Sequence, residues 1–383
     1  MGSKKLILGC STILLLCIGL LLFEVLKSSS APAYQDEVGA SLVSNNNQPL
    51  SHRESGSENY HRDANTRSAD NSSIGTGSIE LSYVDPSLPI QPILPVADIE
   101  IEKARVGWFL FRDPGLSSNS QVSCESCHNL QTNGAELIPV SLGVHGAGQR
   151  NSLTVFNVVY NYRFFWDGRV NSLEEQLDGP VHNPVEMDSN WEDIYDYVSQ
   201  SDKYQSLFSD AGLEISIDTI KGTIVEFERA LTTLSAPFDR YLAGEEEAIN
   251  SSAERGWQAF QSEGCIACHQ GTNVGGGLVM RFGYFGQDKT GSERSSDLGR
   301  FTTTSKPEDR HLFRVSSLRN VADTAPYFHD GQTQQLTDAI RIMGQSQLGK
   351  ELDESTIEDI YQFLLTLSGQ RPAILEEFEH END

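Results

Sequence analysis

Two Cys-x-x-Cys-His motifs constrain the fold of this chain more than any other feature. The first lies at residues 124–128 and the second at 265–269, and each follows a Gly-Trp-x-x-Phe stretch, at 107–111 and 256–260. The side chains of the two motifs are Cys124, Cys127 and His128, then Cys265, Cys268 and His269. Because a helical stretch, a loop and the motif recur in the same order, the sequence predicts two related domains, each built around one motif.

Helical patterns dominate the rest of the predicted body. The second Gly-Trp-x-x-Phe stretch follows a capping-box start at Ser251. Apolar residues recur at helical spacing over 217–231, with a predicted cap at Asp218, and over 357–365, with a predicted start at Ser355. Strand patterns are few and short. The sequence therefore predicts a mostly α fold with long loops.

Three kinds of site use paired cysteines with a histidine. A zinc site could take four ligands from two cysteine pairs, but such pairs usually lie much closer in sequence, and zinc needs no histidine after each second cysteine. A thioredoxin-like site would need a βαβ pattern, which is not visible here. Covalent c-type haem accounts for every residue, because the two thiols add to the haem vinyl groups and the adjacent histidine reaches the iron. The sequence thus predicts two cytochrome c-like domains, with His128 and His269 as proximal iron ligands.

The N-terminus is apolar over a length that suits a bilayer. Lys4 and Lys5 precede a run over residues 6–26 that only Glu24 interrupts, and about 20 apolar residues are needed to span a membrane. We expect an uncleaved inner-membrane anchor that leaves the body on the periplasmic side. A signal cleaved near Ala33, with a soluble periplasmic body, is the alternative. Either arrangement suits haem attachment, which takes place outside the cytoplasm.

Composition changes along the chain and sets the predicted boundaries. Residues 34–95 are rich in Ser, Asn, Asp, Glu and Gly, which is typical of a disordered tether. The predicted organisation is a signal or anchor over 1–33, a tether over 34–95, an N-terminal haem domain over 96–240 and a C-terminal haem domain over 241–383.

The chain is strongly acidic, with 28 Lys and Arg against 54 Asp and Glu and a formal net charge of −26. This charge disfavours nucleic acid as a partner and favours a cationic protein. An acidic surface can also serve solubility alone, so both interpretations remain at this point.

Six longer motifs complete the pattern. They are GVHGAGQRN at 143–151, FWDGR at 165–169, EEQLDGPVHNPVEM at 174–187, FDRYLAGE at 238–245, SLRNVADTAPYFHDG at 317–331 and IMGQSQLG at 342–349. Together with the two cysteine motifs, this order resembles the bacterial dihaem cytochrome c peroxidases, a family that includes the MauG-type enzymes. The resemblance covers essentially the whole predicted globular part.

The resemblance implies that the first haem is the low-potential, peroxidatic one. His145 matches a distal ligand that leaves the iron on reductive activation, and Gln176 and Glu186 match the pair that handles peroxide. A carboxylate there can move a proton between the two peroxide oxygens. Trp166 matches an indole between the haems. On the residues alone, His145 could be a mobile loop histidine, Glu186 a surface carboxylate and Trp166 a packed aromatic.

The resemblance makes the second haem the high-potential site of electron entry, with Met343 as its distal sulfur ligand. Met280 is the competitor, since a methionine at helical spacing is more often part of a core than a ligand. Asn151, Thr324 and Pro326 match a Ca²⁺ site at the domain interface, the last two through backbone carbonyls.

The function implied first is reduction of hydrogen peroxide to water. Electrons from a cationic donor such as a cytochrome c would enter at the Met343 haem, pass Trp166 and reach peroxide at the His128 haem. The alternative is a MauG-like oxidase that removes electrons from Trp or Tyr side chains of a partner protein; those enzymes carry a Tyr ligand where Met343 stands, which favours the peroxidase. A non-catalytic dihaem electron carrier ranks last, because Gln176 and Glu186 would then be idle. The sequence leaves a homodimer open.

Overall fold

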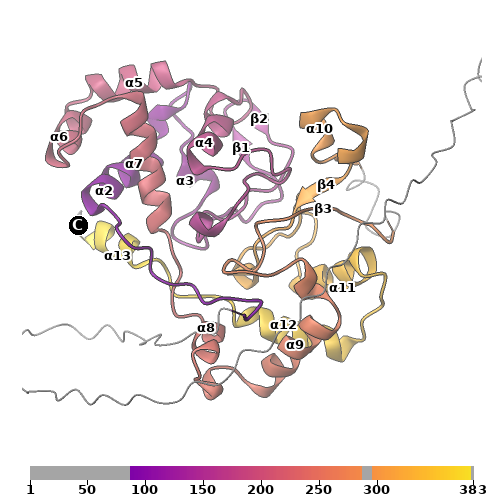
Figure 1. Ribbon diagram of the computed structural model, residues 1–383. Helices are drawn as coiled ribbons and strands as arrows, with labels where there is room; N and C mark the ends of the chain where they lie inside the picture. Colours follow the sequence, from indigo (N-terminus) through magenta and orange to yellow (C-terminus); the bar gives the residue numbers. More distant parts are fainter. Residues whose placement is uncertain (1–86, 287–295, 381–383) are drawn as a thin grey trace, which may run out of the picture. The chain divides into compact units, whose positions relative to one another are not determined.

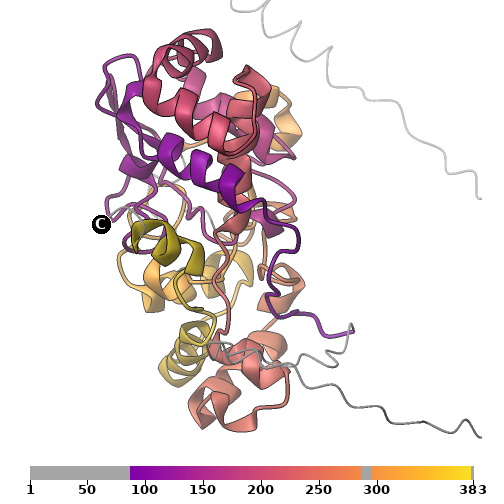
Figure 2. The same cartoon turned by 90° about the vertical axis from the view of Figure 1, so that its left-hand side faces the viewer.

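The computed structural model describes residues 87–286 and 296–380 (Figures 1 and 2). The predicted anchor and residues 34–86 of the predicted tether lie outside the described residues. Helices dominate the described part, and its strands are only two or three residues long. The predicted mostly α fold is therefore confirmed. In this part of the chain no helix is both long and apolar enough to cross a bilayer.

The elements follow in chain order. The α-helices of the described residues are α2 (Ile101–Phe111), α3 (Cys124–Cys127), α4 (Leu173–His182), α5 (Trp191–Gln200), α6 (Asp202–Asp210), α7 (Ile217–Ala230), α8 (Pro237–Leu242), α9 (Ser251–Ser262), α10 (Phe301–Thr304), α11 (Leu336–Gln347), α12 (Glu354–Leu365) and α13 (Ala373–His380). Short 3-10 helices are η1 (Pro114–Leu116), η2 (Val158–Tyr160), η3 (Glu246–Ala248), η4 (Cys265–Ala267), η7 (Pro307–Asp309) and η8 (Val321–Asp323). Two antiparallel ribbons pair β1 (Leu142–Gly143) with β2 (Gly146–Ala147), and β3 (Val279–Arg281) with β4 (Leu312–Arg314).

Three helices begin earlier than predicted. Asn250 caps α9, Ser216 caps α7 and Asp353 caps α12, each by accepting a hydrogen bond from the backbone N–H three residues later. The predicted caps at Ser251 and Asp218 and the predicted start at Ser355 instead lie within the first turns. A capping residue needs extended backbone outside the helix, and all three observed caps have it.

A first hydrophobic core forms where α2 packs on α7 (Figure 1). The glycine of the first Gly-Trp-x-x-Phe stretch permits this close approach, because a β-carbon on Gly107 would lie 1.9 Å from Thr223 O. The phenylalanine of the same stretch, Phe111, packs edge-to-face on Phe227 with ring centroids 5.4 Å apart. Both residues are thus used for helix packing.

A second core repeats this arrangement with α9 and α12. A β-carbon on Gly256 would lie 1.8 Å from Asp359 O, and Phe260 packs on Phe363 with ring centroids 5.1 Å apart. The predicted repeat therefore corresponds to the same helix crossing made twice, and the repeated glycine and phenylalanine have the same packing role in each half.

A second repeat follows each cysteine motif and escaped the sequence analysis. Asn157 and Asn320 both have a left-handed backbone, with φ of 61° and 59°, and each precedes a 3-10 turn. A matching turn begins seven residues beyond each asparagine. An isolated β-bridge closes this turn, between Phe164 and Val170 in the first half and between Tyr327 and Thr333 in the second. This equivalence is also visible in the sequence, since five of fourteen residues are identical between 157–170 and 320–333, among them the Phe-x-Asp-Gly of each turn. It makes Trp166 equivalent to His329.

The two ends of the body cross between the cores, which differs from the predicted boundaries. Ile90, assigned to the tether, is buried in the second core, and so is Phe238, assigned to the N-terminal domain. At the other end α13 packs into the first core, where Phe378 lies 5.7 Å from the ring of Trp108 (Figures 1 and 2). Composition hid this, because Ile90 lies in a Pro-rich stretch that looks like a linker.

Candidate active site

The first cysteine motif occupies one short helical turn. Ser123 and Ser126 form a capping box at the start of α3, which places Cys124 and Cys127 on a single turn. His128 follows at the end of the turn, and its Nδ1 lies 3.3 Å from Gly134 O. Burial lowers the pKa of His128, against the opposing effect of nearby backbone carbonyls. The imidazole is therefore neutral near pH 7, which is the form that ligates iron through Nε2.

The second motif has the same chemistry on a 3-10 turn. Gly264, with φ of 104°, leads into η4, and His269 follows Cys268. Burial lowers the pKa of His269 to about 4, so this imidazole is also neutral. All four cysteines of the motifs are free, and burial raises the pKa of the Cys124 thiol to about 12. Protonated thiols beside a neutral imidazole fit covalent haem attachment at each motif.

The alternative of a shared zinc site does not fit the observed packing. Cys124 packs against the first core and Cys265 against the second. Within residues 87–286 and 296–380, no three His, Cys, Asp or Glu side chains gather as a metal site. Each motif therefore serves a separate centre.

The structure brings the His145 loop and Glu186 together. His145 lies at the turn of the β1–β2 hairpin, and its backbone N–H donates to Val185 O at 3.3 Å, while Val144 N donates to Glu186 O at 2.8 Å. Gly143 permits this contact, since a β-carbon there would lie 2.1 Å from Val185 O. The exposed His145 side chain contacts the Asp188 carboxylate, with Nε2 2.9 Å from Oδ2. The hairpin is thus fixed through its backbone.

The Glu186 carboxyl is held by a neighbour that the sequence analysis missed. Asn183 Nδ2 donates to Glu186 Oε1 at 2.8 Å. Burial raises the pKa of Glu186, against the opposing effects of the Asn183 hydrogen bond and the Arg169 charge. After burial and Glu136, the Glu186 charge also helps to raise the pKa of Cys127, so this carboxyl lies near the first motif. The sequence carries no specific signal for this pairing, because an asparagine three residues before a glutamate is ordinary in a loop.

Gln176 lies on α4, the helix that leads into the Glu186 segment. Ser172 caps α4, and its carbonyl accepts a hydrogen bond from Gln176 N at 3.1 Å. The Gln176 side chain is half-buried. Its helix therefore ends in the loop that carries Asn183 and Glu186.

The two candidate sulfur ligands of the second centre lie in different settings. Met343 is half-buried on α11, next to the buried residues Ile340 and Gly344. This helix packs into the same core as Cys265. Met280 lies on β3 with 46% of its surface exposed. Met343 is therefore the less exposed of the two methionines, and it lies on a helix that contributes to the second core.

Trp166 lies where the two halves meet. Its Nε1 donates to Asn151 O at 2.8 Å, and Asn151 N donates to His329 O at 2.8 Å. The rings of Trp166 and His329 pack edge-to-face with centroids 6.1 Å apart, and His329 also stacks on Phe313 at 4.1 Å. Equivalent positions of the second repeat thus contact each other at this junction.

An ion-pair network, also missed from sequence, joins the halves at the same place. Arg150 makes two hydrogen bonds to Asp297, at 2.7 and 2.8 Å, and a third to Asp167 at 3.0 Å. Burial alone would raise the pKa of Asp297, but the hydrogen bonds and charge of Arg150 outweigh it and hold that pKa below its usual value. The pair is therefore ionised at neutral pH.

The predicted calcium ligands lie along this junction. Asn151 is buried, and its Nδ2 donates to Ile138 O at 3.2 Å, which leaves Oδ1 as its oxygen donor for a cation. Its backbone bond to His329 ties it to the segment that carries Thr324 and Pro326. The Ca²⁺ site stays a prediction.

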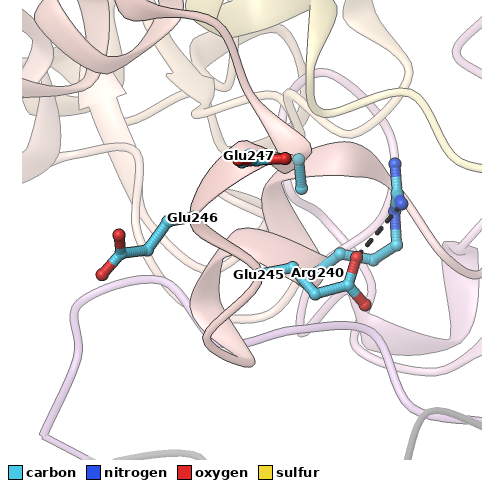
Figure 3. Close-up of a pocket in the computed structure, with 5 residues that line it drawn as sticks. Arg240, Glu245, Glu246 and Glu247 are labelled. Carbon is cyan, nitrogen blue, oxygen red and sulfur yellow. Dashed lines mark hydrogen bonds and ion pairs between the residues drawn. The ribbon is translucent and has the colours of Figure 1, made fainter.

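An open hollow on the surface is formed by different residues. It is lined by Arg240, Glu245, Glu246, Glu247 and Ala248, from α8 and η3 (Figure 3). Arg240 Nη1 pairs with Glu245 Oε2 at 3.2 Å. Arg240 and Glu245 belong to the FDRYLAGE motif, but neither the cysteine-motif residues nor His145, Gln176, Glu186 and Met343 line this hollow, so the candidate site lies elsewhere.

Comparison with known proteins identifies the family. A model described as di-haem cytochrome c peroxidase matches residues 101–247. The chain is 42% identical over 285 residues to the cytochrome c551 peroxidase of Pseudomonas aeruginosa, covering 72% of this chain and 81% of that protein. It is 32% identical over 290 residues to the methylamine utilization protein MauG of Methylorubrum extorquens, covering 71% and 80%.

A solved structure agrees. The crystal structure of a MauG-like protein associated with microbial copper homeostasis superimposes with a TM-score of 0.64 at 25% identity, covering 74% of this chain and 94% of that one. The chain therefore belongs to the dihaem cytochrome c peroxidase family. It is an oxidoreductase of the cytochrome c peroxidase type with two covalent c-type haems, and the predicted family, enzyme class and haems are confirmed.

Proposed function

We propose that this enzyme reduces hydrogen peroxide to water at the His128 centre with electrons that a cytochrome c delivers at the His269 centre. One observation carries the choice of centre: the hairpin of His145 is hydrogen-bonded to the Glu186 segment, and Glu186 lies near Cys127 of the first motif. The name of the Pseudomonas relative supports the donor class.

The protein side chains handle the protons. Bound haem iron supplies the site for peroxide and the path for electrons. Glu186 takes a proton from one peroxide oxygen and returns it to the other, so that the O–O bond breaks with water as the leaving group. One peroxide, two electrons and two protons give two waters. Asn183 fixes the acceptor oxygen of Glu186, and burial raises the pKa of Glu186, which makes its protonated form more accessible than in water. The Gln176 amide assists by hydrogen bonding to peroxide.

His145 controls access in this proposal. Its backbone is fixed to the Val185–Glu186 segment, and its exposed imidazole is hydrogen-bonded through Nε2 to Asp188 Oδ2 at 2.9 Å, a position that an imidazole released from iron could occupy while the hairpin stays in place. We assign it as a releasable distal ligand of the first haem. The test compares the fully oxidised enzyme with the half-reduced enzyme: only the latter should turn over at full rate.

Met343 is the proposed distal ligand of the second haem, and Trp166 lies on the proposed electron path. A thioether ligand raises the potential of a His-ligated haem and suits electron entry. The half-buried position of Met343 on a core helix supports this choice over Met280. A redox titration with spectra should resolve one high-potential, Met-ligated haem and one of low potential. Two equal low potentials would refute the assignment.

A protein-oxidising, MauG-like role is the second candidate, favoured by the identity to MauG and by the fold of the MauG-like structure. Its mark would be oxidised Trp or Tyr in a partner protein treated with the enzyme and peroxide. Turnover of peroxide with a cytochrome c alone supports the first function.

Three proposals concern the surroundings of the enzyme. Asn151, Thr324 and Pro326 bind Ca²⁺ at the junction, so chelation should lower activity and Ca²⁺ should restore it.

Residues 6–26 hold the body on the periplasmic side of the inner membrane, which fractionation of cells tests against release as a soluble protein. A homodimer is the third proposal, and sedimentation tests it.

A further inference from the structure

Arg314 is a buried cation that lacks a carboxylate partner among the described residues. It ends β4 with 4% of its surface exposed. Its Nε donates to Phe165 O at 3.2 Å, while Nη1 is buried without a hydrogen-bond partner. Burial lowers the pKa of Arg314 to about 10. A guanidinium in such a place is costly unless an anion meets it.

Arg319 shows how this fold treats a similar charge elsewhere. It is also buried, with 2% exposed, but its Nη2 lies 2.6 Å from Asp239 Oδ1. Arg319 also donates to the carbonyls of Thr272 and Gln91. The Nη1 of Arg319 is also buried without a hydrogen-bond partner, but the counter-charge of Arg319 is part of the chain. Arg314 differs because no carboxylate of the described residues lies beside it.

The second repeat places Arg314 at the junction of the halves. Arg314 is equivalent to Asn151, just as Trp166 is equivalent to His329. The backbone N–H of Arg314 donates to Trp166 O at 2.6 Å, and that of Asn151 donates to His329 O at 2.8 Å. Two equivalent residues thus exchange equivalent hydrogen bonds across the junction, as in an isologous contact.

The same chain segment continues to the second cysteine motif. Two residues beyond Arg314, the backbone of Ser316 hydrogen-bonds the imidazole of His269. The guanidinium therefore lies on the segment that borders the second centre, beside the turn that carries Trp166. The anion that a haem brings to such a place is the carboxylate of a propionate.

We propose that Arg314 binds a propionate of the second haem. This inference rests on the proposed function only in taking the His269 centre as the haem of electron entry. A guanidinium fork matches a carboxylate in two parallel hydrogen bonds, and Arg314 has its Nη1 free for one of them. Neutralising the propionate favours the reduced form of the haem. Arg314 is thus a positioning residue that raises the second haem's potential, in addition to the effect of its sulfur ligand.

The test uses the holoenzyme and its reduction potentials. Arg314→Gln should lower the midpoint potential of the second haem and leave that of the first unchanged. Arg314→Lys keeps the charge and should restore most of the potential, and it serves if the Gln variant does not fold. The propionate bending band in resonance Raman spectra of that haem should shift in the Gln variant.

A matched control removes another cation from the same junction. Arg300 donates to the carbonyls of Asp167 and Gly168 but has Asp309 as its carboxylate neighbour at 3.8 Å. Arg300→Gln should leave both potentials unchanged. A second control concerns residues 287–295, which lie outside the described residues and carry two carboxylates, those of Asp288 and Glu293. The double variant Asp288→Asn with Glu293→Gln removes both and should leave the two potentials unchanged.

Three outcomes would overturn the proposal. They are an unchanged second-haem potential in Arg314→Gln, a shift confined to the first haem, and an equal shift in the Asp288 and Glu293 double variant. The proposed function fails separately, because an enzyme without peroxide turnover could still show the Arg314 effect on potential and Raman band.

Discussion

Glu186 and Asn183 show how a single side chain acquires a chemical role. A carboxyl three residues after an asparagine is ordinary in a loop, but here the amide holds one carboxyl oxygen and burial raises the carboxyl pKa. The sequence indicated Glu186 through family resemblance alone. Asn183 was not indicated, because its importance depends on a side-chain hydrogen bond that no periodicity reveals.

Replacing Glu186 with Gln tests the proton-transfer role. Glu186→Gln keeps the size and the hydrogen-bonding capacity of the side chain but removes the transferable proton. We expect both haem spectra to persist and the reaction with peroxide to slow by roughly 10²–10⁴-fold. Stopped-flow mixing of the half-reduced enzyme with peroxide measures this rate. Glu192→Gln, at an exposed position on α5, is the control. An unchanged rate in Glu186→Gln would remove this carboxyl from the mechanism.

Met343→His tests the sulfur ligand. An imidazole in place of the thioether should lower the second haem's potential and suppress reductive activation, because the electron-entry site would no longer accept electrons readily. Spectroelectrochemistry measures the potential. Met280→Leu changes the exposed competitor and should leave the potential alone. The reverse pattern would transfer the ligand role to Met280.

At the scale of elements, the sequence showed that the Gly-Trp-x-x-Phe stretch is repeated, but it did not show why each stretch needs its glycine. The glycine is fixed by contact with the backbone of a helix more than one hundred residues away, at Thr223 in one half and Asp359 in the other. Amphipathic spacing located α7 and α12, whereas the cap of each lies two residues before the predicted position. Local spacing identifies a helix better than it identifies the first residue of the helix.

Two helical glycines of the first half give a matched test of this packing. Gly107→Ala would place a β-carbon 1.9 Å from Thr223 O and should lower the free energy of unfolding by about 1–3 kcal/mol. Gly222→Ala on α7 meets nothing closer than Lys103 Cε at 3.8 Å. That variant should be neutral or stabilising by up to about 1 kcal/mol. Chemical denaturation compares them, and equal effects would contradict the close helix approach.

Glu228, on the buried face of α7, predicts a pH dependence of stability. Burial raises its pKa to about 8, well above the usual value near 4.5, so the folded state holds a proton that the unfolded state releases. The stability contributed by this group is fully present below the unfolded pKa and is lost as pH rises through about 8. Glu228→Gln should therefore flatten the fall of the unfolding free energy between roughly pH 4.5 and 8. Parallel slopes for variant and wild type would contradict the raised pKa.

At the scale of the whole molecule, the two haem centres were predictable and the junction between them was not. The four cysteines and two histidines of the Cys-x-x-Cys-His motifs indicated the centres, because covalent haem attachment needs these residues at a fixed local spacing. Arg150 and Asp297 are far apart in sequence, and neither carries a local signal for the other. The crossing of Ile90 and α13 between the cores was hidden for the same reason. Contacts between residues far apart in sequence form only when the whole body folds, so local patterns do not predict them.

The net charge of −26 gives the last prediction, which concerns encounter with the donor. An acidic protein attracts a basic cytochrome c over about 30 Å at 0.01 M salt, but over only about 8 Å at 0.15 M. The apparent second-order rate with a basic cytochrome c should therefore fall steeply over this range, while the rate with a small neutral reductant stays level. Steady-state assays with both donors on one enzyme preparation separate steering from any effect of salt on the haems. A flat response to salt with the basic cytochrome c would assign the acidic charge to solubility alone.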